Sequence, residues 1–365
     1  MWPYWLMFII FALLAVGGKE HRSNQKTGLR TARFTPRAVF IWLVLVIMIG
    51  LRFDVGGDWG NYLQSFSLMR GWPLETVLER SRFEPGYALV SYLSDLAGAG
   101  IYGVNLFCAV IFTTGLVIFC RTLPYPELAI AAATPYVIIV VAMGYTRQSV
   151  ALGFEMLGLV ALARRSFVWF IIWIALGVTF HKTAAVLIPL VGLMNARNRI
   201  WVVLWGVAFS VAGYLVLMGQ GEADFYIRNY VASQMSSSGA WIRVLMNVVP
   251  ALLLLVWRRR FTFGPGDEKL WFWMAMISLG LVVGLVATPA STAIDRMALY
   301  VIPIQMFVFS NLPIVMRDRL GSAQPVILAI LCYYMLVQLV WLNFANNAWA
   351  WVPYDSVLSA TSSRR

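Results

Sequence analysis

Charged residues are scarce in this chain. Only 12% of its 365 residues are charged and only 16 are acidic, whereas 61% are hydrophobic. A soluble domain needs a more polar surface, so this composition excludes one and predicts an integral membrane protein. The chain also lacks the short alternating apolar segments of a transmembrane barrel, and its apolar runs have the length of helices. We therefore expect an all-α integral membrane protein.

Cysteine and histidine are also rare. The three cysteines, Cys108, Cys120 and Cys332, all lie in apolar runs, so neither a disulfide framework nor a metal cluster is indicated. Asp54 and Asp58 are four residues apart, but the sequence offers no obvious third ligand for a metal ion. We expect no metal and no cofactor.

The apolar runs predict about twelve membrane-spanning helices within one polytopic domain, residues 1–365. The first run lacks a small-residue cleavage site and is expected to be a retained helix rather than a removed signal peptide. The predicted spans are 2–17, 38–52, 102–120, 127–143, 148–163, 166–180, 183–195, 200–218, 242–257, 269–287, 296–314 and 323–343.

The net charge of +12 reflects membrane topology. Most Lys and Arg residues fall in alternate loops, and loops rich in these residues stay on the cytoplasmic side of a membrane. The excess of positive charge therefore gives no reason to expect a nucleic-acid partner. The predicted inside loops are those at 19–37, 121, 164–165, 197–199, 258–269 and 317–319.

Two long segments are predicted to lie on the opposite, outer face, namely 53–101 and 219–241. Within the first, residues 85–97 would form a helix of about 20 Å, too short for a hydrocarbon core of about 30 Å. We expect this helix to be re-entrant or interfacial, because only then do all basic loops share one side. The second segment has a Ser/Gly run typical of a lid.

Six short polar segments are spread in order along the chain and make it similar to a known family. They are Arg52 with Gly57–Tyr62, then Glu84–Tyr87, Gly144–Ala151, Phe180–Ala184, Ile294–Tyr300 and Trp351–Tyr354. The chain resembles the EpsG family of bacterial polysaccharide polymerases, which is related to the Wzy-type polymerases of O-antigen and exopolysaccharide. It lacks the very large outer loops of some O-antigen polymerases.

The resemblance implies a glycosyltransferase of GT-C-like plan in the bacterial inner (cytoplasmic) membrane, with its active site facing the periplasm or exterior. Its substrates would be a donor and an acceptor oligosaccharide, each linked to a polyprenyl diphosphate such as undecaprenyl diphosphate. The partners expected with it are the lipid bilayer, a chain-length regulator and a flippase.

Such a reaction releases a diphosphate, whose growing negative charge fixed guanidinium groups would stabilise. The candidates for diphosphate binding are Arg52, Arg147, Arg296 and Lys182. In the competing interpretation each cation reaches the interface or pairs with a nearby acid, as Arg296 would with the adjacent Asp295.

The acceptor hydroxyl needs a base, for which Asp58, Glu84 and His181 are the candidates. Asp58 and Glu84 equally suit helix N-termini, and a histidine at a sunken turn is ordinarily a satisfied polar residue. Further candidates for substrate binding are the aromatic and polar side chains of Trp59, Tyr62, Tyr87, Gln148, Asp295 and Tyr300.

A transporter or flippase of lipid-linked glycan is the main alternative from another class. It would favour ionisable residues at the bilayer midplane and two related halves. Glu155 is the one acid deep in a predicted span, and the halves show no evident similarity. An O-antigen ligase or a transferase of single sugars is the alternative within the same class.

Overall fold

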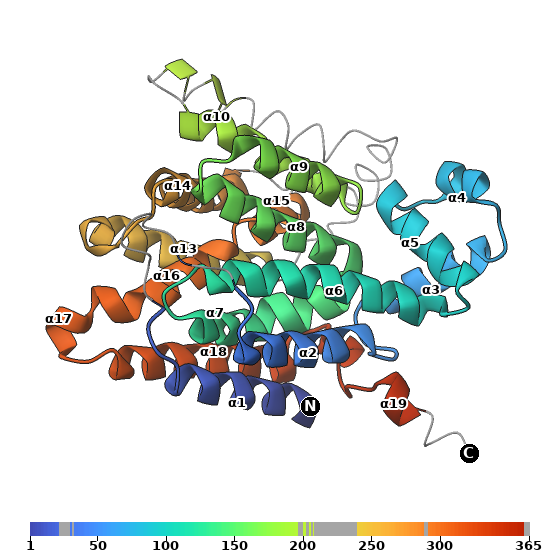
Figure 1. Ribbon diagram of the computed structural model, residues 1–365, viewed down its shortest axis with the longest axis horizontal. Helices are drawn as coiled ribbons and strands as arrows, with labels where there is room; N and C mark the ends of the chain where they lie inside the picture. The colour runs from blue at the N-terminus through green and yellow to red at the C-terminus, as the bar shows by residue number, and fades with distance from the viewer. Residues whose placement is uncertain are drawn as a thin grey trace.

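The computed structural model describes residues 1–21, 30, 33–195, 200, 201, 204, 205, 207, 239–287 and 291–360. All regular elements in these residues are helices (Figure 1), which confirms the all-α class. The first half contains α1 (Trp2–Val16), α2 (Pro36–Gly50), α3 (Trp59–Met69), α4 (Leu74–Arg80), α5 (Pro85–Leu96), α6 (Gly100–Arg121), α7 (Pro126–Ala133), the π-helix η1 (Thr134–Ala142), α8 (Thr146–Ala163), α9 (Phe167–Val178), the 3-10 helix η2 (Lys182–Leu187) and α10 (Pro189–Asn195). The second half contains α13 (Ala240–Trp257), η4 (Arg258–Arg260), α14 (Asp267–Ala287), α15 (Ser291–Leu299), α16 (Pro303–Val315), α17 (Arg317–Leu320), α18 (Gln324–Phe344), η5 (Ala348–Ala350) and α19 (Val357–Ala360).

Several of these helices suit a membrane. By length and composition, five described helices can cross one, namely Gly100–Arg121, Ala240–Arg260, Asp267–Ala287, Ile294–Val315 and Gln324–Phe344. Shorter apolar helices occupy Trp2–Val16, Pro36–Gly50, Pro126–Ala142, Phe167–Val178 and Lys182–Asn195. The chain is therefore a multi-pass membrane protein. The predicted span 200–218 lies mostly outside the described residues, so the predicted total of about twelve stays a prediction.

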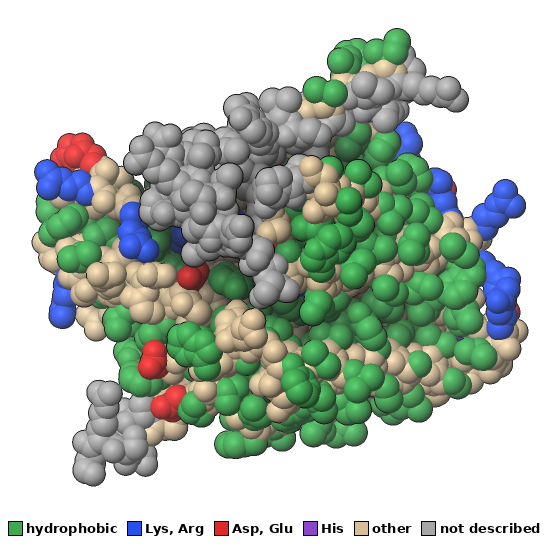
Figure 2. Space-filling model, turned by 180° about the vertical axis from the view of Figure 1, so that it is seen from behind, with side chains coloured by type: hydrophobic (Ala, Val, Ile, Leu, Met, Phe, Trp, Pro, Cys, Tyr) green, Lys and Arg blue, Asp and Glu red, His purple; other side chains and the backbone are tan. Residues whose placement is uncertain are grey.

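Described parts of several loops predicted to be basic and inside meet at one end of the bundle, the end that carries α17. Arg317 pairs with Glu20 at 2.7 Å, and the carbonyl oxygen of Arg121 lies 2.9 Å from His21 Nδ1. Figure 2 shows blue Lys and Arg side chains along its right-hand edge, which is this end seen from behind, next to a mainly hydrophobic surface. The end that carries α17 thus has the charge pattern expected of a cytoplasmic face.

The segment 53–101, which was predicted to lie outside, folds into the three short helices α3, α4 and α5, which lie together at the opposite end (Figure 1). At the start of α5 the Gly86 amide donates to the carbonyl of Thr179 at 2.7 Å, and near its end Ser94 Oγ donates to the carbonyl of Gly100 at 2.5 Å. Gly100 begins α6, which runs from this end to Arg121 at the α17 end. Helix α5 therefore begins and ends on the same side of the bundle.

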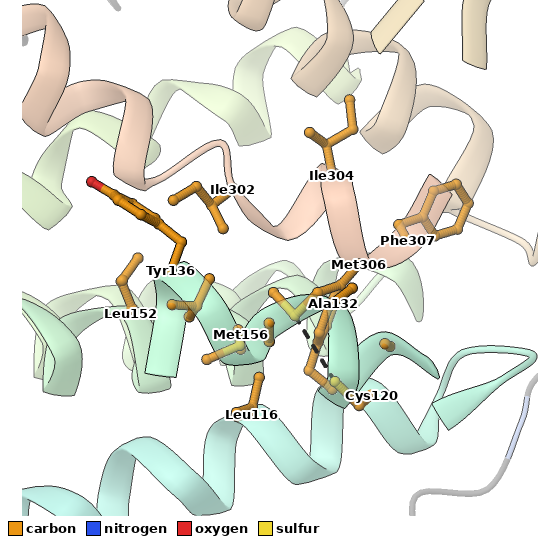
Figure 3. Packing of buried hydrophobic residues seen from close by; sticks show 14 of the residues in the cluster. Leu116, Cys120, Ala132, Tyr136, Leu152, Met156, Ile302, Ile304, Met306 and Phe307 are labelled. Carbon is orange, nitrogen blue, oxygen red and sulfur yellow. Dashed lines mark hydrogen bonds between the residues drawn. The ribbon is translucent and has the colours of Figure 1, made fainter. Parts of the chain in front are cut away.

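The core lies where α6, α7, α8 and α16 pack together (Figure 3). Helices α6 and α8 approach so closely that a Cβ atom on Gly115 would overlap the carbonyl oxygen of Gly153. Close packing through small residues is typical of membrane helices, which gain little from the hydrophobic effect when they associate. This packing fixes α8, whose N-terminus carries two of the predicted site residues.

The predicted span 127–143 is not a uniform helix. It begins as α7 and continues as the π-helix η1, whose second residue is Pro135. Proline has no amide hydrogen to donate to the carbonyl four residues earlier, and Pro135 is therefore a local cause of the change from α-helix to π-helix. Figure 3 shows the hydroxyl of Tyr136 pointing away from the other labelled core residues.

Candidate active site

A cavity of about 1030 Å³ lies at the end of the bundle opposite α17. Seven of the residues predicted from the sequence to form the site line it: Asp58, Tyr62, Arg147, Gln148, His181, Asp295 and Arg296. They come from α3 and its N-cap, α8, the turn between α9 and η2, and α15, which are distant in the sequence. The topology predicted from the sequence places six candidate residues on one face. Asp58, Arg147, His181 and Arg296 of these line the cavity, whereas Arg52 and Glu84 do not.

Asp58 is held at the cavity by close backbone packing. Gly56 has a φ of +110°, and a Cβ atom there would overlap the carbonyl oxygen of Met143. A Cβ atom on Gly57 would lie only 3.3 Å from the indole ring of Trp351. Gly56 and Gly57 therefore allow the backbone to pack closely on Met143 and Trp351, and this packing places Asp58 at the cavity.

The C-terminal segment Trp351–Tyr354, noted in the sequence, anchors this region. Trp351 is fully buried, and its indole Nε1 donates to the carbonyl of Ile139 at 2.8 Å. Gly144, just before α8, packs so closely on the same indole that a Cβ atom there would overlap the ring. The Gly56 amide also donates to the carbonyl of Ala350 at 2.8 Å. The segment thus supports the backbone that leads into α3.

The electrostatic surroundings of Asp58 act in opposite directions. Asp58 is the N-cap residue of α3, but its side chain makes no capping hydrogen bond. Burial raises the pKa of its carboxyl group, whereas the positive charge of Arg147, a hydrogen bond with Asn61 and the charge of Arg296 lower it. A carboxylate held in this way is a stronger base than an exposed one and still has cations beside it.

Arg147 and Glu84, predicted separately as a diphosphate ligand and a base, form an ion pair. Arg147 Nη1 donates to Glu84 Oε2, and the backbone amide of Lys182 donates to Glu84 Oε1 at 3.2 Å. The guanidinium carbon of Arg147 also lies 4.2 Å from the centre of the Phe83 ring. Glu84 therefore fixes the orientation of Arg147 at the cavity and ties α8 to the turn before η2.

His181 begins a short chain of hydrogen-bonding groups. Its Nδ1 lies 2.5 Å from Thr183 Oγ1, which lies 2.8 Å from the Tyr300 hydroxyl. Burial lowers the pKa of His181 well below its ordinary value, and the charges of Arg147 and Arg296 lower it further. The imidazole is therefore neutral at neutral pH and suited to accept a hydrogen bond. Tyr300 is itself buried and connects to His181 through Thr183.

Arg243, one turn into α13, was not predicted as a site residue. Its guanidinium donates two hydrogen bonds to Asp295, one from Nε to Oδ1 and one from Nη2 to Oδ2. Asp295 thus pairs with Arg243, whereas the carbonyl of Arg296 accepts from Gln148 Nε2 at 3.5 Å. The sequence did contain a signal for this residue. Arg243 is a cation near the start of an otherwise apolar helix, as Arg147 is in α8.

Other predicted residues lie away from the described lining. Arg52 is 1% exposed, and its guanidinium donates to the carbonyls of Ile49 and Val55 and to the side chains of Asn105 and Thr146. Two further residues of this kind pack in aromatic groups, Trp59 with Phe53 and Tyr102, and Tyr87 with Tyr62 and Phe83. Their contacts are those of a scaffold around the cavity, and their roles in binding stay predictions.

These features define a multi-pass, all-helical membrane protein with a cavity of arginines, acids and a neutral histidine at one end. Residues 38–356 match the model of the EpsG family, and the chain belongs to that family. Neither the curated proteins nor the solved structures contain a match to this chain. The resemblance to EpsG proteins is thereby confirmed, and the wider relation to Wzy-type polymerases stays a prediction.

Proposed function

We propose that this protein is a glycosyltransferase that polymerises oligosaccharide repeat units carried on polyprenyl diphosphate. The observation that carries the proposal is the joint presence of Arg147, Arg243 and Arg296 with Asp58 and His181 around one cavity. Membership of the EpsG family supports it by suggesting a role in exopolysaccharide biosynthesis. The product would be an exopolysaccharide or an O-antigen, made at the outer face of the bacterial inner membrane on a GT-C-like plan.

In the proposed reaction a hydroxyl oxygen of the acceptor sugar forms a bond to the anomeric carbon of the donor glycan. The bond from that carbon to the diphosphate oxygen breaks, and the diphosphate leaves with the electron pair. The proton of the hydroxyl passes to a base. The guanidinium groups stabilise the charge that develops on the leaving group, which is a large term in a site sheltered from water.

We assign the base role to Asp58 and the positioning of the acceptor to His181. Asp58 is a carboxylate whose pKa burial raises, and the carboxylate of Glu84 is already engaged by Arg147 and the Lys182 amide. His181 is neutral, and its Nδ1 is oriented by Thr183, so the ring is fixed for contact with a sugar hydroxyl.

The experiment that tests the function is deletion of the gene in its host, followed by analysis of the lipid-linked glycans. Polymerisation predicts that polymer is lost and single repeat units accumulate on lipid. The wild-type gene should restore polymer, whereas Arg147→Ala or His181→Ala should not, although both proteins reach the membrane.

Two other outcomes would replace this function. Glycan that accumulates only on the inner side would favour a transporter or flippase. The buried acid Glu155 is the feature of the chain that this alternative would use. Full-length polymer on the lipid carrier that fails to reach its final acceptor would favour a ligase.

A further inference from the structure

The cavity has two chemically different parts. One is the charged part that contains Arg147, Arg243 and Asp58. The other is apolar and is formed by one side of α13 and one side of α18. Its main side chains are Ile242, Met246, Leu336, Val340, Trp341 and Phe344.

The apolar part reaches the exposed side of the bundle. Leu336, Val340 and Phe344 are spaced by four residues and so share one face of α18, where they are 57%, 49% and 72% exposed. Across the cavity Ile242 of α13 is 62% exposed. Side chains that line the cavity are therefore also exposed on the hydrophobic surface that a bilayer would cover. An apolar chain can enter this part of the cavity from the side.

The depth of the apolar part fits one half of a bilayer. From Tyr333 to Phe344 helix α18 extends about 16 Å, close to half of a hydrocarbon core of about 30 Å. The residues at the far end of this stretch, Asn346 and Asn347, are polar and line the cavity too. The apolar part thus has the depth of one leaflet and ends at a polar rim.

Helix α13 joins the two parts. Arg243 follows Ile242 directly, and Met246 lies one turn further on the same side of the helix. A ligand with a negative head and a long apolar tail would place the head at Arg243 and the tail along Met246 and α18. An anionic head fits the arginines, and an apolar tail fits the exposed leucine, valine and phenylalanine side chains.

We propose that the apolar part between α13 and α18 binds the prenyl chain of a polyprenyl diphosphate substrate, which enters laterally from the outer leaflet. This inference rests on the proposed function and assigns it a lipid-binding site. The proposed ligand is a prenyl diphosphate. The test below distinguishes it from an ordinary phospholipid.

The test uses the full-length protein in lipid nanodiscs and undecaprenyl diphosphate that carries a photoreactive diazirine in its prenyl chain. We expect cross-links to Leu336, Val340 or Phe344, which excess unlabelled undecaprenyl diphosphate removes and excess phosphatidylglycerol leaves. Cross-links spread over the hydrophobic surface, or removed equally by phosphatidylglycerol, would overturn the proposal.

Matched variants on α18 make the test specific. Leu336→Trp and Val340→Trp fill the cavity and should weaken specific labelling by about tenfold or more. Leu328→Trp and Leu339→Trp alter side chains of similar exposure that do not line the cavity, and they should leave labelling unchanged. Equal effects of both pairs would contradict the proposal, and unchanged thermal unfolding would show that all four variants fold.

Binding of this probe requires no glycan and no transfer. A protein that binds the probe at α18 but never links repeat units would overturn the proposed polymerase activity and leave the lipid site standing. Polymerisation without specific labelling at α18 would do the reverse.

Discussion

Arg243 and Asp295 lie 52 residues apart in the sequence and form a two-point ion pair, with Arg243 Nη2 2.5 Å from Asp295 Oδ2. The pair joins α13 to α15 at the wall of the cavity. A guanidinium held at two points by a carboxylate has a fixed plane, which suits it to meet a diphosphate in one orientation. This geometry makes Arg243 as strong a candidate for diphosphate binding as Arg147.

We predict that Arg243→Lys lowers the rate of polymerisation although it keeps the charge. Lysine cannot make the two-point contact, and loss of one charge-assisted hydrogen bond in the site corresponds to a fall of about 10- to 100-fold. The measurement is the initial rate of product formation by purified protein at equal amounts in the membrane. A rate equal to that of the wild type would remove Arg243 from the site.

We predict that Glu84→Gln lowers the rate by a similar factor, because it removes the charge that orients Arg147. The matched control is Glu268→Gln, which breaks the more exposed pair with Arg258 near the α17 end. Exposed pairs contribute about 0–1 kcal/mol, so the control should retain its rate. Equal losses in the two variants would indicate a general effect on folding.

The decrease of the rate at low pH, the acid limb of the pH–rate profile, should follow the ionisation of Asp58. The base must be ionised, so the rate falls as the pH decreases through its pKa, which burial raises above the ordinary 3.8. Arg82 lowers this pKa, so Arg82→Gln should move the acid limb to higher pH. Arg80 is also exposed but is not among the groups that shift Asp58, so Arg80→Gln should leave the limb in place. A pH–rate profile that is identical in all three proteins would argue against Asp58 as the base.

The packing of Gly144 on Trp351 gives a prediction about stability. Gly144→Ala places a methyl group against the indole ring and should destabilise the protein by about 1–3 kcal/mol or more. In Gly280→Ala, on α14, the added methyl group meets no atom within 4 Å, and the change should stay within about 1 kcal/mol. Thermal unfolding in detergent measures both. Equal stability of the two variants would show that the C-terminal segment does not anchor the Asp58 region.

The sequence was sufficient for the helical class, for the meeting of several described basic loops at one end of the bundle and for the convergence of Asp58, Arg147, His181 and Arg296. These follow from hydropathy and loop charge, which depend on the local sequence and on the membrane alone. The ion-pair partners of the charged side chains could not be predicted from the sequence. Arg147 pairs with Glu84 across 63 residues, and such pairs are set by the packing of helices.

Helices α3 and α4 of the predicted outer segment and the apolar part of the cavity were also missed. Residues 59–80 were predicted only as part of an outer loop, yet α3 and α4 form there around buried aromatic side chains such as Tyr62. Leu336, Val340 and Phe344 belong to an apolar run, and hydropathy alone does not distinguish them from their apolar neighbours in that run. Only the position of α13 across from them distinguishes the side chains that line a cavity from those that face lipid alone.

The most direct measurement is reconstitution of the purified protein in liposomes with a single lipid-linked repeat unit as donor and acceptor. The products are separated by length, and released polyprenyl diphosphate is counted against glycosidic bonds formed. We predict a ladder of lengthened glycans with one polyprenyl diphosphate released for each new bond, and its loss in Asp58→Asn and Arg147→Ala. An unchanged ladder in both variants, or movement of the repeat unit across the membrane with no new bond, would contradict the account.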